Sequence, residues 1–263
     1  MTPRRSSRFP LPLLTGALAA AGLITTAHAQ IQTAPPLFVD VDATAVPYGA
    51  VTAVTNLGTL GGVFQGFSNP LIADSPGGAA RGIQFDGAAY MILVNSVGGA
   101  RIAPPAGLVG ASPTRSIEVW AFNPAIADEE TLLSWGHRGG PAGSNMSFNY
   151  GANAAFGAIG HWDAPDIGWN VVPPAGQWHH LVYTFDGTTT RVYADGVLAN
   201  SETLGAGVLN TYANTSIQLA AQLEADGVTV TPTLKGSLTL AKVRIHDGFL
   251  TPAQVLVKNR LWY

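Results

Sequence analysis

The sequence predicts one all-β domain, built as a two-sheet antiparallel β-sandwich, with an export signal before it and a short C-terminal helix. Two observations predict this fold class. The 263 residues include 31 Gly and 18 Pro, and short β-rich runs alternate with turn residues along the chain. Helical periodicity is confined to the two ends. The chain has no Cys, so its stability must come from core burial, which about 230 residues can supply.

The N-terminus has the three-part layout of a secretory signal peptide. A basic stretch is followed by the apolar run Leu11–Ile24 and by the small-x-small site Ala27-His28-Ala29. We expect cleavage before Gln30, which makes residues 1–29 the signal peptide and residues 30–263 the domain. The apolar run is about 14 residues long, whereas a membrane span needs roughly 20. The expected location is therefore secreted or periplasmic, with no membrane span after cleavage.

Charge excludes two classes of partner. Loss of the signal peptide removes Arg4, Arg5 and Arg8 and no acid, which leaves ten basic and sixteen acidic side chains and a net charge of −6. Such a chain lacks the basic footprint of nucleic-acid binding. It also lacks the polybasic patch that anionic membranes attract. The Arg4-Arg5 pair leaves the general secretory and twin-arginine routes both open.

Strands are predicted from short runs rich in β-branched and aromatic residues that are bounded by turn residues. The Gly-rich segment Leu57–Ala80 is predicted to be an irregular surface excursion within the domain. The predicted strands are Leu37–Val41, Gly82–Phe85, Tyr90–Leu93, Ser116–Phe122, Thr131–Trp135, Met146–Tyr150, Ala155–His161, His179–Phe185, Thr190–Ala194, Val197–Ser201, Ser216–Ala221 and Gly236–His246.

Turn chemistry supports this division. Five Asp-Gly pairs lie between the runs. These pairs favour turns, because Gly adopts a positive φ and the Asp side chain bonds nearby backbone N–H groups. The pair Asp195-Gly196 is the best candidate for a two-residue hairpin turn. The inward phase of the last strand changes near Leu240, which predicts a β-bulge or burial on both faces there. Thr251 to Gln254 form a capping box that starts the C-terminal helix, with Pro252 at its first position. The five pairs are Asp86-Gly87, Asp186-Gly187, Asp195-Gly196, Asp226-Gly227 and Asp247-Gly248.

Four segments resemble, in order, the laminin G-like (LamG) domains of the concanavalin A-like lectin/glucanase type. The hairpin Gln177–Gly196 carries the closest resemblance. Ile83–Gly87 and Ser116–Trp120 resemble two earlier strands of those domains, and Lys242–Thr251 resembles their last strand with its lead into a terminal helix. The resemblance extends over about residues 37–258. It implies a jelly roll of two antiparallel sheets, one of them concave.

The resemblance implies binding or catalysis without choosing between them. Domains of this kind mostly bind glycans or protein partners, sometimes through calcium, and others are glycosidases or lyases. Three functions therefore stay open: a lectin-like carbohydrate-binding domain, which we favour, a glycoside hydrolase or polysaccharide lyase, and a surface adhesion or structural module that binds a protein.

The candidate ligand-binding residues lie in the turn-rich stretch Ser134–Trp169. It places aromatic rings beside amide, carboxylate and guanidinium groups, and this mixture suits sugars. The rings cover the apolar face of a pyranose while the polar groups pair with its hydroxyls. Loops on a rigid sandwich are a common place for such sites. The predicted ligand-binding residues are His137, Arg138, Asn145, His161, Trp162, Asp163, Asp166 and Trp169.

Enzyme motifs are weak in comparison. The Glu-x-Asp-x-x-Glu pattern of the glycosidases in this superfamily does not occur, nor does Gly-x-Ser-x-Gly. Asp128-Glu129-Glu130 is predicted to be a solvated turn, and the pair His179-His180 to be structural. If the protein is an enzyme, the first residues to mutate are Glu118, His137, Arg138 and His161.

Metal binding is predicted mainly through the resemblance. Zinc patterns such as His-Glu-x-x-His do not occur. Calcium takes oxygen ligands from carboxylates and carbonyls at loop tips. The candidates by residue type are Asp86, Asp163, Asp166 and Asp247, although their spacing is not that of an EF-hand.

Overall fold

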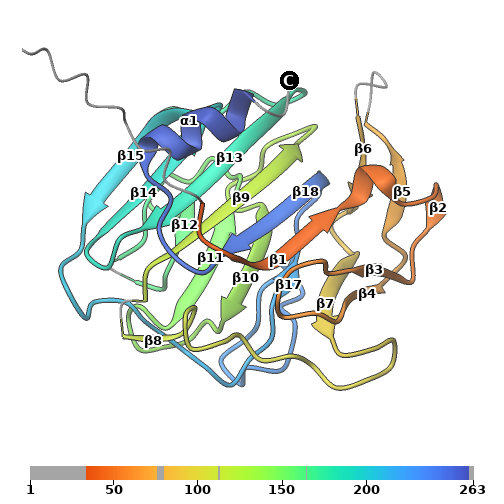
Figure 1. Ribbon diagram of the computed structural model, residues 1–263, viewed down its shortest axis with the longest axis horizontal. Helices are drawn as coiled ribbons and strands as arrows, with labels where there is room; N and C mark the ends of the chain where they lie inside the picture. The colour runs from red at the N-terminus through yellow and green to blue at the C-terminus, as the bar shows by residue number, and fades with distance from the viewer. Residues whose placement is uncertain (1–33, 76–79, 112, 164, 261–263) are drawn as a thin grey trace, which may run out of the picture. The chain divides into compact units, whose positions relative to one another are not determined.

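Two antiparallel β-sheets form the main body of the computed structural model (Figure 1). It describes residues 34–75, 80–111, 113–163 and 165–260, so the predicted signal peptide lies outside the described residues. The larger sheet has the strand order β15-β14-β13-β9-β18-β6-β5-β2, with β1 also paired to β18. Its strands are β1 (Leu37–Asp42), β2 (Gly49–Ala50), β5 (Leu71–Asp74), β6 (Arg81–Gln84), β9 (Arg115–Phe122), β13 (Trp178–Phe185), β14 (Thr189–Ala194), β15 (Val197–Thr203) and β18 (Thr239–His246).

The second sheet has seven strands in the order β12-β11-β10-β17-β7-β4-β3. A separate ribbon pairs β8 (Gly110–Ala111) with β16 (Asn210–Thr211), and a 3-10 turn, η1 (Ala43–Ala45), follows β1. The strands of the second sheet are β3 (Ala53–Thr55), β4 (Val63–Phe67), β7 (Tyr90–Val94), β10 (Thr131–Gly136), β11 (Asn145–Asn149), β12 (Ile159–Gly160) and β17 (Gln218–Leu219).

The core lies between the inner faces of the two sheets. Ile117 and Val119 of β9 and Met146 and Phe148 of β11 are fully buried in one apolar cluster. The rings of Phe148 and Tyr183, one from each sheet, are 6.4 Å apart. Alternation along each strand sends every second side chain into this layer, so the β-sandwich prediction is confirmed.

The helix α1 (Pro252–Arg260) covers part of the outer face of the nine-stranded sheet (Figure 1). Val255 of α1 and the nearby Leu250 pack with Val182 and Tyr193 in a second buried apolar cluster. The predicted capping box is confirmed at its start. The backbone N–H of Thr251 donates to Gln254 Oε1 at 2.7 Å, and the N–H of Gln254 donates to Thr251 Oγ1 at 3.3 Å. Within the part of the chain that the structure describes, no helix has the length and apolar character of a membrane span.

Most predicted strands are observed with shifts at their ends, and three segments differ. The segment Ser216–Ala221 forms a strand only at Gln218–Leu219. The segment Ala155–His161 forms a strand only at Ile159–Gly160, because Asn153 Oδ1 accepts the N–H groups of Ala155 and Phe156 and turns the chain first. The predicted irregular excursion Leu57–Ala80 contains β4 and β5. Their pairing with β7 and β6 supplies a strand environment that the local sequence does not reveal.

Four of the five predicted Asp-Gly turns are confirmed, and so is the bulge. Asp86, Asp186 and Asp226 each accept backbone N–H groups from the residues two and three positions later. Asp195-Gly196 joins β14 to β15 as a tight hairpin. The pairing of β18 with β9 shifts register between Leu240 and Lys242, where the sequence predicts the bulge.

Candidate functional site

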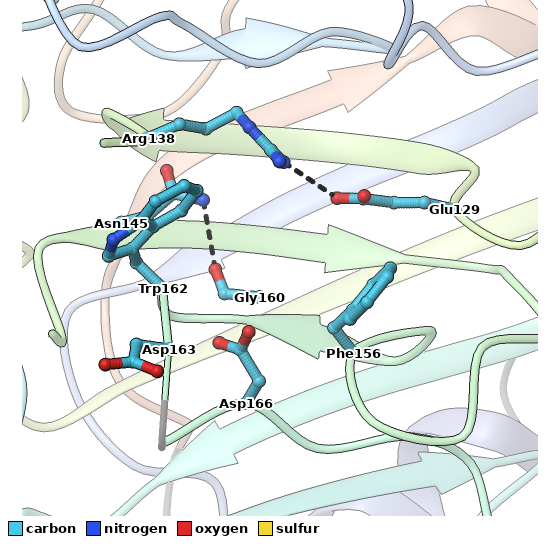
Figure 2. Close-up of a pocket in the computed structure, with 8 residues that line it drawn as sticks. All are labelled: Glu129, Arg138, Asn145, Phe156, Gly160, Trp162, Asp163 and Asp166. Carbon is cyan, nitrogen blue, oxygen red and sulfur yellow. Dashed lines mark hydrogen bonds and ion pairs between the residues drawn. The ribbon is translucent and has the colours of Figure 1, made fainter. Parts of the chain in front are cut away.

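A pocket of about 290 Å³ lies beside β10, β11 and β12, at one edge of the seven-stranded sheet (Figure 2). Asn145 opens β11 and points away from the core, because its neighbour Met146 points into it. Five of the predicted ligand-binding residues line this pocket together with three others. The lining residues are Glu129, Arg138, Asn145, Phe156, Gly160, Trp162, Asp163 and Asp166.

Gln222 links the polar groups on one side of the pocket. Its Nε2 donates to Glu129 Oε1 at 2.6 Å, and its Oε1 accepts from Asn145 Nδ2 and from Arg138 Nη1, each at 3.3 Å. The Gln222 side chain is fully buried. These bonds fix the positions of three lining side chains before any ligand arrives.

Arg138 connects the polar side to the aromatic side. Its Nη1 is 3.4 Å from Glu129 Oε1 in an ion pair, and its guanidinium lies 5.2 Å from the ring centroid of Trp162. A cation over an aromatic face is attractive. Trp162 therefore has a defined orientation, and with Phe156 it gives the pocket two aromatic rings.

Asn145 carries an unsatisfied acceptor in the wall of this pocket. Its Nδ2 donates to the carbonyl oxygen of Gly160 at 3.1 Å and to Gln222, which fixes the orientation of the amide. The other atom, Oδ1, is buried without a hydrogen-bond partner, and the residue is 2% exposed. A buried acceptor left unpaired costs about 1–3 kcal/mol. A donor from a ligand would remove that cost.

The loop after β12 is held in an uncommon conformation. Trp162 and Asp163 have φ angles of 79° and 64°, a region that L-residues seldom occupy. His161 anchors the loop from beneath. Its Nδ1 donates to the carbonyl of Pro165 at 2.9 Å, so its Nε2 accepts from the hydroxyl of Tyr183 at 3.0 Å. These two bonds tie the start of the loop to the core.

Asp166 has an altered acidity. Burial raises the pKa of its carboxyl to about 7, and the nearby charge of Glu129 acts in the same direction. The backbone N–H of His161, which donates to Asp166 Oδ1 at 2.6 Å, opposes this rise, as does Arg138. The pocket thus disfavours a further negative charge.

Three predicted binding residues do not line the pocket. Trp169 packs in the core against Phe148 and donates from Nε1 to the carbonyl of Gly157 at 3.1 Å. His137 donates from Nδ1 to the carbonyl of Arg138 at 2.7 Å. His161 is fully buried beneath the pocket loop, and burial lowers the pKa of its imidazole to about 3, so the ring is neutral.

The residues named for an enzymatic alternative do not share one site. Glu118 is 2% exposed on the outer face of the nine-stranded sheet, where it accepts from His180, His246 and Lys258. Of the set, Arg138 lines the pocket, whereas His137 and His161 have the structural contacts described above. The prediction of a structural role for His180 agrees with its bond to Glu118.

The prediction that Asp128-Glu129-Glu130 is a solvated turn is wrong for its two glutamates. Glu130 is 5% exposed and accepts the backbone N–H of Ser237 at 2.6 Å. Glu129 pairs with Arg138 and Gln222 and lines the pocket. Phe156 lines the pocket and Gln222 bonds its lining residues, and the sequence patterns indicated neither role. Only 11% of the residues are charged, so the adjacent pair Glu129-Glu130 was unusual, and this was the sequence feature that could have indicated a role for Glu129.

The four predicted calcium ligands do not form one ligand set. Asp163 and Asp166 line the pocket, whereas Asp86 accepts backbone N–H groups in its own turn. Asp247 is exposed and does not line the pocket. Across the described ranges, no group of three or more metal-ligating side chains has a geometry that could hold an ion.

Comparison with known proteins assigns the family. The model of the concanavalin A-like lectin/glucanases superfamily matches residues 97–256, more than half of the chain. The chain belongs to this superfamily. The match confirms the resemblance seen in the motifs, and it includes every residue that lines the pocket. A comparison with curated proteins found no match.

Solved structures with low sequence identity share the fold. Domain 4 of an extracellular arabinanase from Geobacillus stearothermophilus, in complex with arabinotriose, matches with a TM-score of 0.58 and 20% identity, over 86% of this chain and 98% of that chain. The binding domain of a paraclostridial mosquitocidal protein matches with a TM-score of 0.53 and 12% identity, over 86% and 52%. The binding domain of botulinum neurotoxin DC, in complex with rat synaptotagmin II, gives 0.51 and 10%, over 87% and 52%. The chain thus spans about half the length of these two toxin domains.

Proposed function

We propose that the protein is an exported glycan-binding module and that its glycan occupies the pocket lined by Trp162, Phe156 and Asn145. One observation carries the proposal: two aromatic rings lie in the same pocket as a buried, unpaired acceptor, Asn145 Oδ1. A pyranose ring has an apolar face for an aromatic ring and hydroxyl donors at its edge. Its binding would satisfy both features at once.

The size and preorganisation of the pocket agree with this function. Its volume of about 290 Å³ is near the lower end of the range for small-molecule sites, which is roughly 300–1,000 Å³. Gln222 and Arg138 hold the lining groups in place, and this lowers the entropy cost of binding. The arabinanase domain with the same fold is described in complex with arabinotriose, which adds support for a saccharide ligand.

A glycan array followed by calorimetry tests the proposal. We expect the protein without residues 1–29 to bind at least one class of oligosaccharide on the array, and we expect Trp162→Ala to weaken that binding. Trp178→Ala is the matched control, because Trp178 stacks on Trp120 in the nine-stranded sheet and does not line the pocket. Absence of binding to plant, algal and bacterial glycans would contradict the proposal. Equal losses in the two variants would contradict the location of the site.

Glycoside hydrolysis is the second candidate, because one observation favours it. Asp166, with a pKa of about 7, can donate a proton near neutral pH, and Glu129 is a second carboxylate in the same pocket. Glycosidases use two carboxyl groups in one site. Release of reducing sugar from a bound polysaccharide, abolished by Asp166→Asn, would establish this activity. A module that only binds releases none.

A further inference from the structure

A second hollow of about 500 Å³ lies next to the pocket and shares Asp163 and Asp166 with it. We call the two hollows together the acidic groove. The two hollows are neighbours on either side of these shared residues, so together they offer room for more than one sugar ring. The second hollow is lined by Ala154, Ala155, Asp163, Asp166, Ile167, Gly168, Asn200 and Glu202.

Charge in the groove is unbalanced. Among the described lining residues there are four carboxyl groups and one cation, Arg138, which is paired with Glu129. Because the pKa of Asp166 is about 7, this group is mostly neutral at pH 6, and the unbalanced negative charge comes from Asp163 and Glu202. Asp163 is exposed at the point where the hollows meet. The four carboxyl groups are those of Glu129, Asp163, Asp166 and Glu202.

The polar groups of the groove are also unbalanced in their hydrogen bonding. The carboxylates of Glu129, Asp163 and Glu202 accept and do not donate, and the buried unpaired atom, Asn145 Oδ1, is an acceptor too. A ligand suited to this groove brings donors and positive charge. Acidic sugars bring the reverse, and like charge in a partly buried site opposes their binding.

We propose that the acidic groove selects a polysaccharide of amino sugars whose amines are free, with ammonium groups on the carboxylates and a sugar ring on Trp162. This inference rests on the proposed glycan binding and specifies its ligand class. An ammonium group has three hydrogen-bond donors and a full positive charge. It therefore offsets both the excess of negative charge and the excess of acceptors. The raised pKa of Asp166 agrees, since its cause is burial together with the charge of Glu129, and a bound cation would compensate for both.

The test compares two oligomers of equal length, a β-1,4-linked glucosamine hexamer and its fully N-acetylated form, by calorimetry at pH 6 in EDTA. We expect the free-amine hexamer to bind at least tenfold more tightly, and we expect the ratio to decrease as salt screens the charges. The double variant Asp163→Asn/Glu202→Gln should bring the ratio close to one. Asp247→Asn, which removes an exposed carboxylate outside the groove, should leave it unchanged.

The outcomes separate the two proposals. Equal binding of the hexamers, or preference for a uronic acid oligomer, would overturn the amino-sugar proposal while glycan binding stands. An oligolysine peptide that binds as tightly as the free-amine hexamer would also overturn it, since charge alone would then account for selection. Binding that requires calcium and fails in EDTA contradicts it as well. Failure of every glycan to bind would overturn both proposals.

Discussion

Replacing Glu118 with Gln tests whether this carboxylate is structural. Three donors converge on it: His180 Nε2 at 3.3 Å, His246 Nε2 at 2.6 Å and Lys258 Nζ at 2.9 Å. Lys258 belongs to α1, so the cluster also fastens the helix to the sheet. Gln keeps the size of the side chain but replaces one acceptor oxygen with a donor. It therefore leaves at least one of the three donors facing another donor.

The expected loss is large because the group is buried. Breaking a buried charge pair by changing one partner typically costs about 3–5 kcal/mol. For a domain of this size each kcal/mol lowers Tm by about 2–4 °C, so we expect a decrease of roughly 6–20 °C. Urea unfolding followed by tryptophan fluorescence measures the free energy at pH 7. Glycan affinity of the folded variant should be unchanged, because Glu118 does not line the pocket.

The pH dependence gives a second check on the same variant. Burial alone raises the pKa of Glu118, but the hydrogen bonds from His180 and His246 and the charge of Lys258 outweigh burial and hold it well below its usual range. The stabilisation is therefore complete above the unfolded pKa, about 4.3, and is lost as the pH falls through the folded pKa. A difference below about 1 kcal/mol at pH 7, or one that grows on acidification, would refute this reasoning.

Three further outcomes follow. Trp162→Ala should weaken glycan binding about tenfold, or 1.4 kcal/mol, by calorimetry; an unchanged affinity would exclude ring stacking there. Asp166→Asn should stabilise the fold by about 2–4 kcal/mol at pH 8 and have little effect at pH 4. The carboxyl has a folded pKa of about 7, so its ionisation destabilises the native state progressively as the pH rises from about 4 to 7, and Asn removes this loss. A lower Tm of the variant at pH 8 would count against this reasoning. Thr251→Ala should cost about 1 kcal/mol in urea unfolding by removing the helix cap, whereas Thr251→Ser should cost much less.

Features set by neighbouring residues were predictable from the sequence. The helix cap depends on Thr251 and Gln254, three positions apart, and the hairpin turn depends on Asp195 and Gly196. The bulge near Leu240 was visible because a strand's inward phase cannot change without one or without burial on both faces. Each of these depends on local geometry that the residue types fix.

Features that depend on distant partners were not predictable. Glu129 looks like a surface turn residue, yet Gln222, 93 positions later, hydrogen-bonds it and helps to make it part of the pocket. The strands β4 and β5 are short and lie among glycines, and they form through pairing with β7 and β6. The mixture of aromatic and polar residues in Ser134–Trp169 did indicate the stretch that supplies most of the pocket lining. It could not show that Trp169 and His161 turn into the core.

The indole N–H signals of the six tryptophans test the central claim directly. In a two-dimensional ¹H–¹⁵N spectrum of the isotope-labelled protein, an oligosaccharide chosen from the array is added stepwise. If the glycan occupies the pocket, the Trp162 indole and the Asn145 side-chain amide shift together and saturate, while Trp135 in the core and Trp178 on the other sheet stay in place. Saturable shifts at Trp178 with Trp162 unmoved would contradict the account.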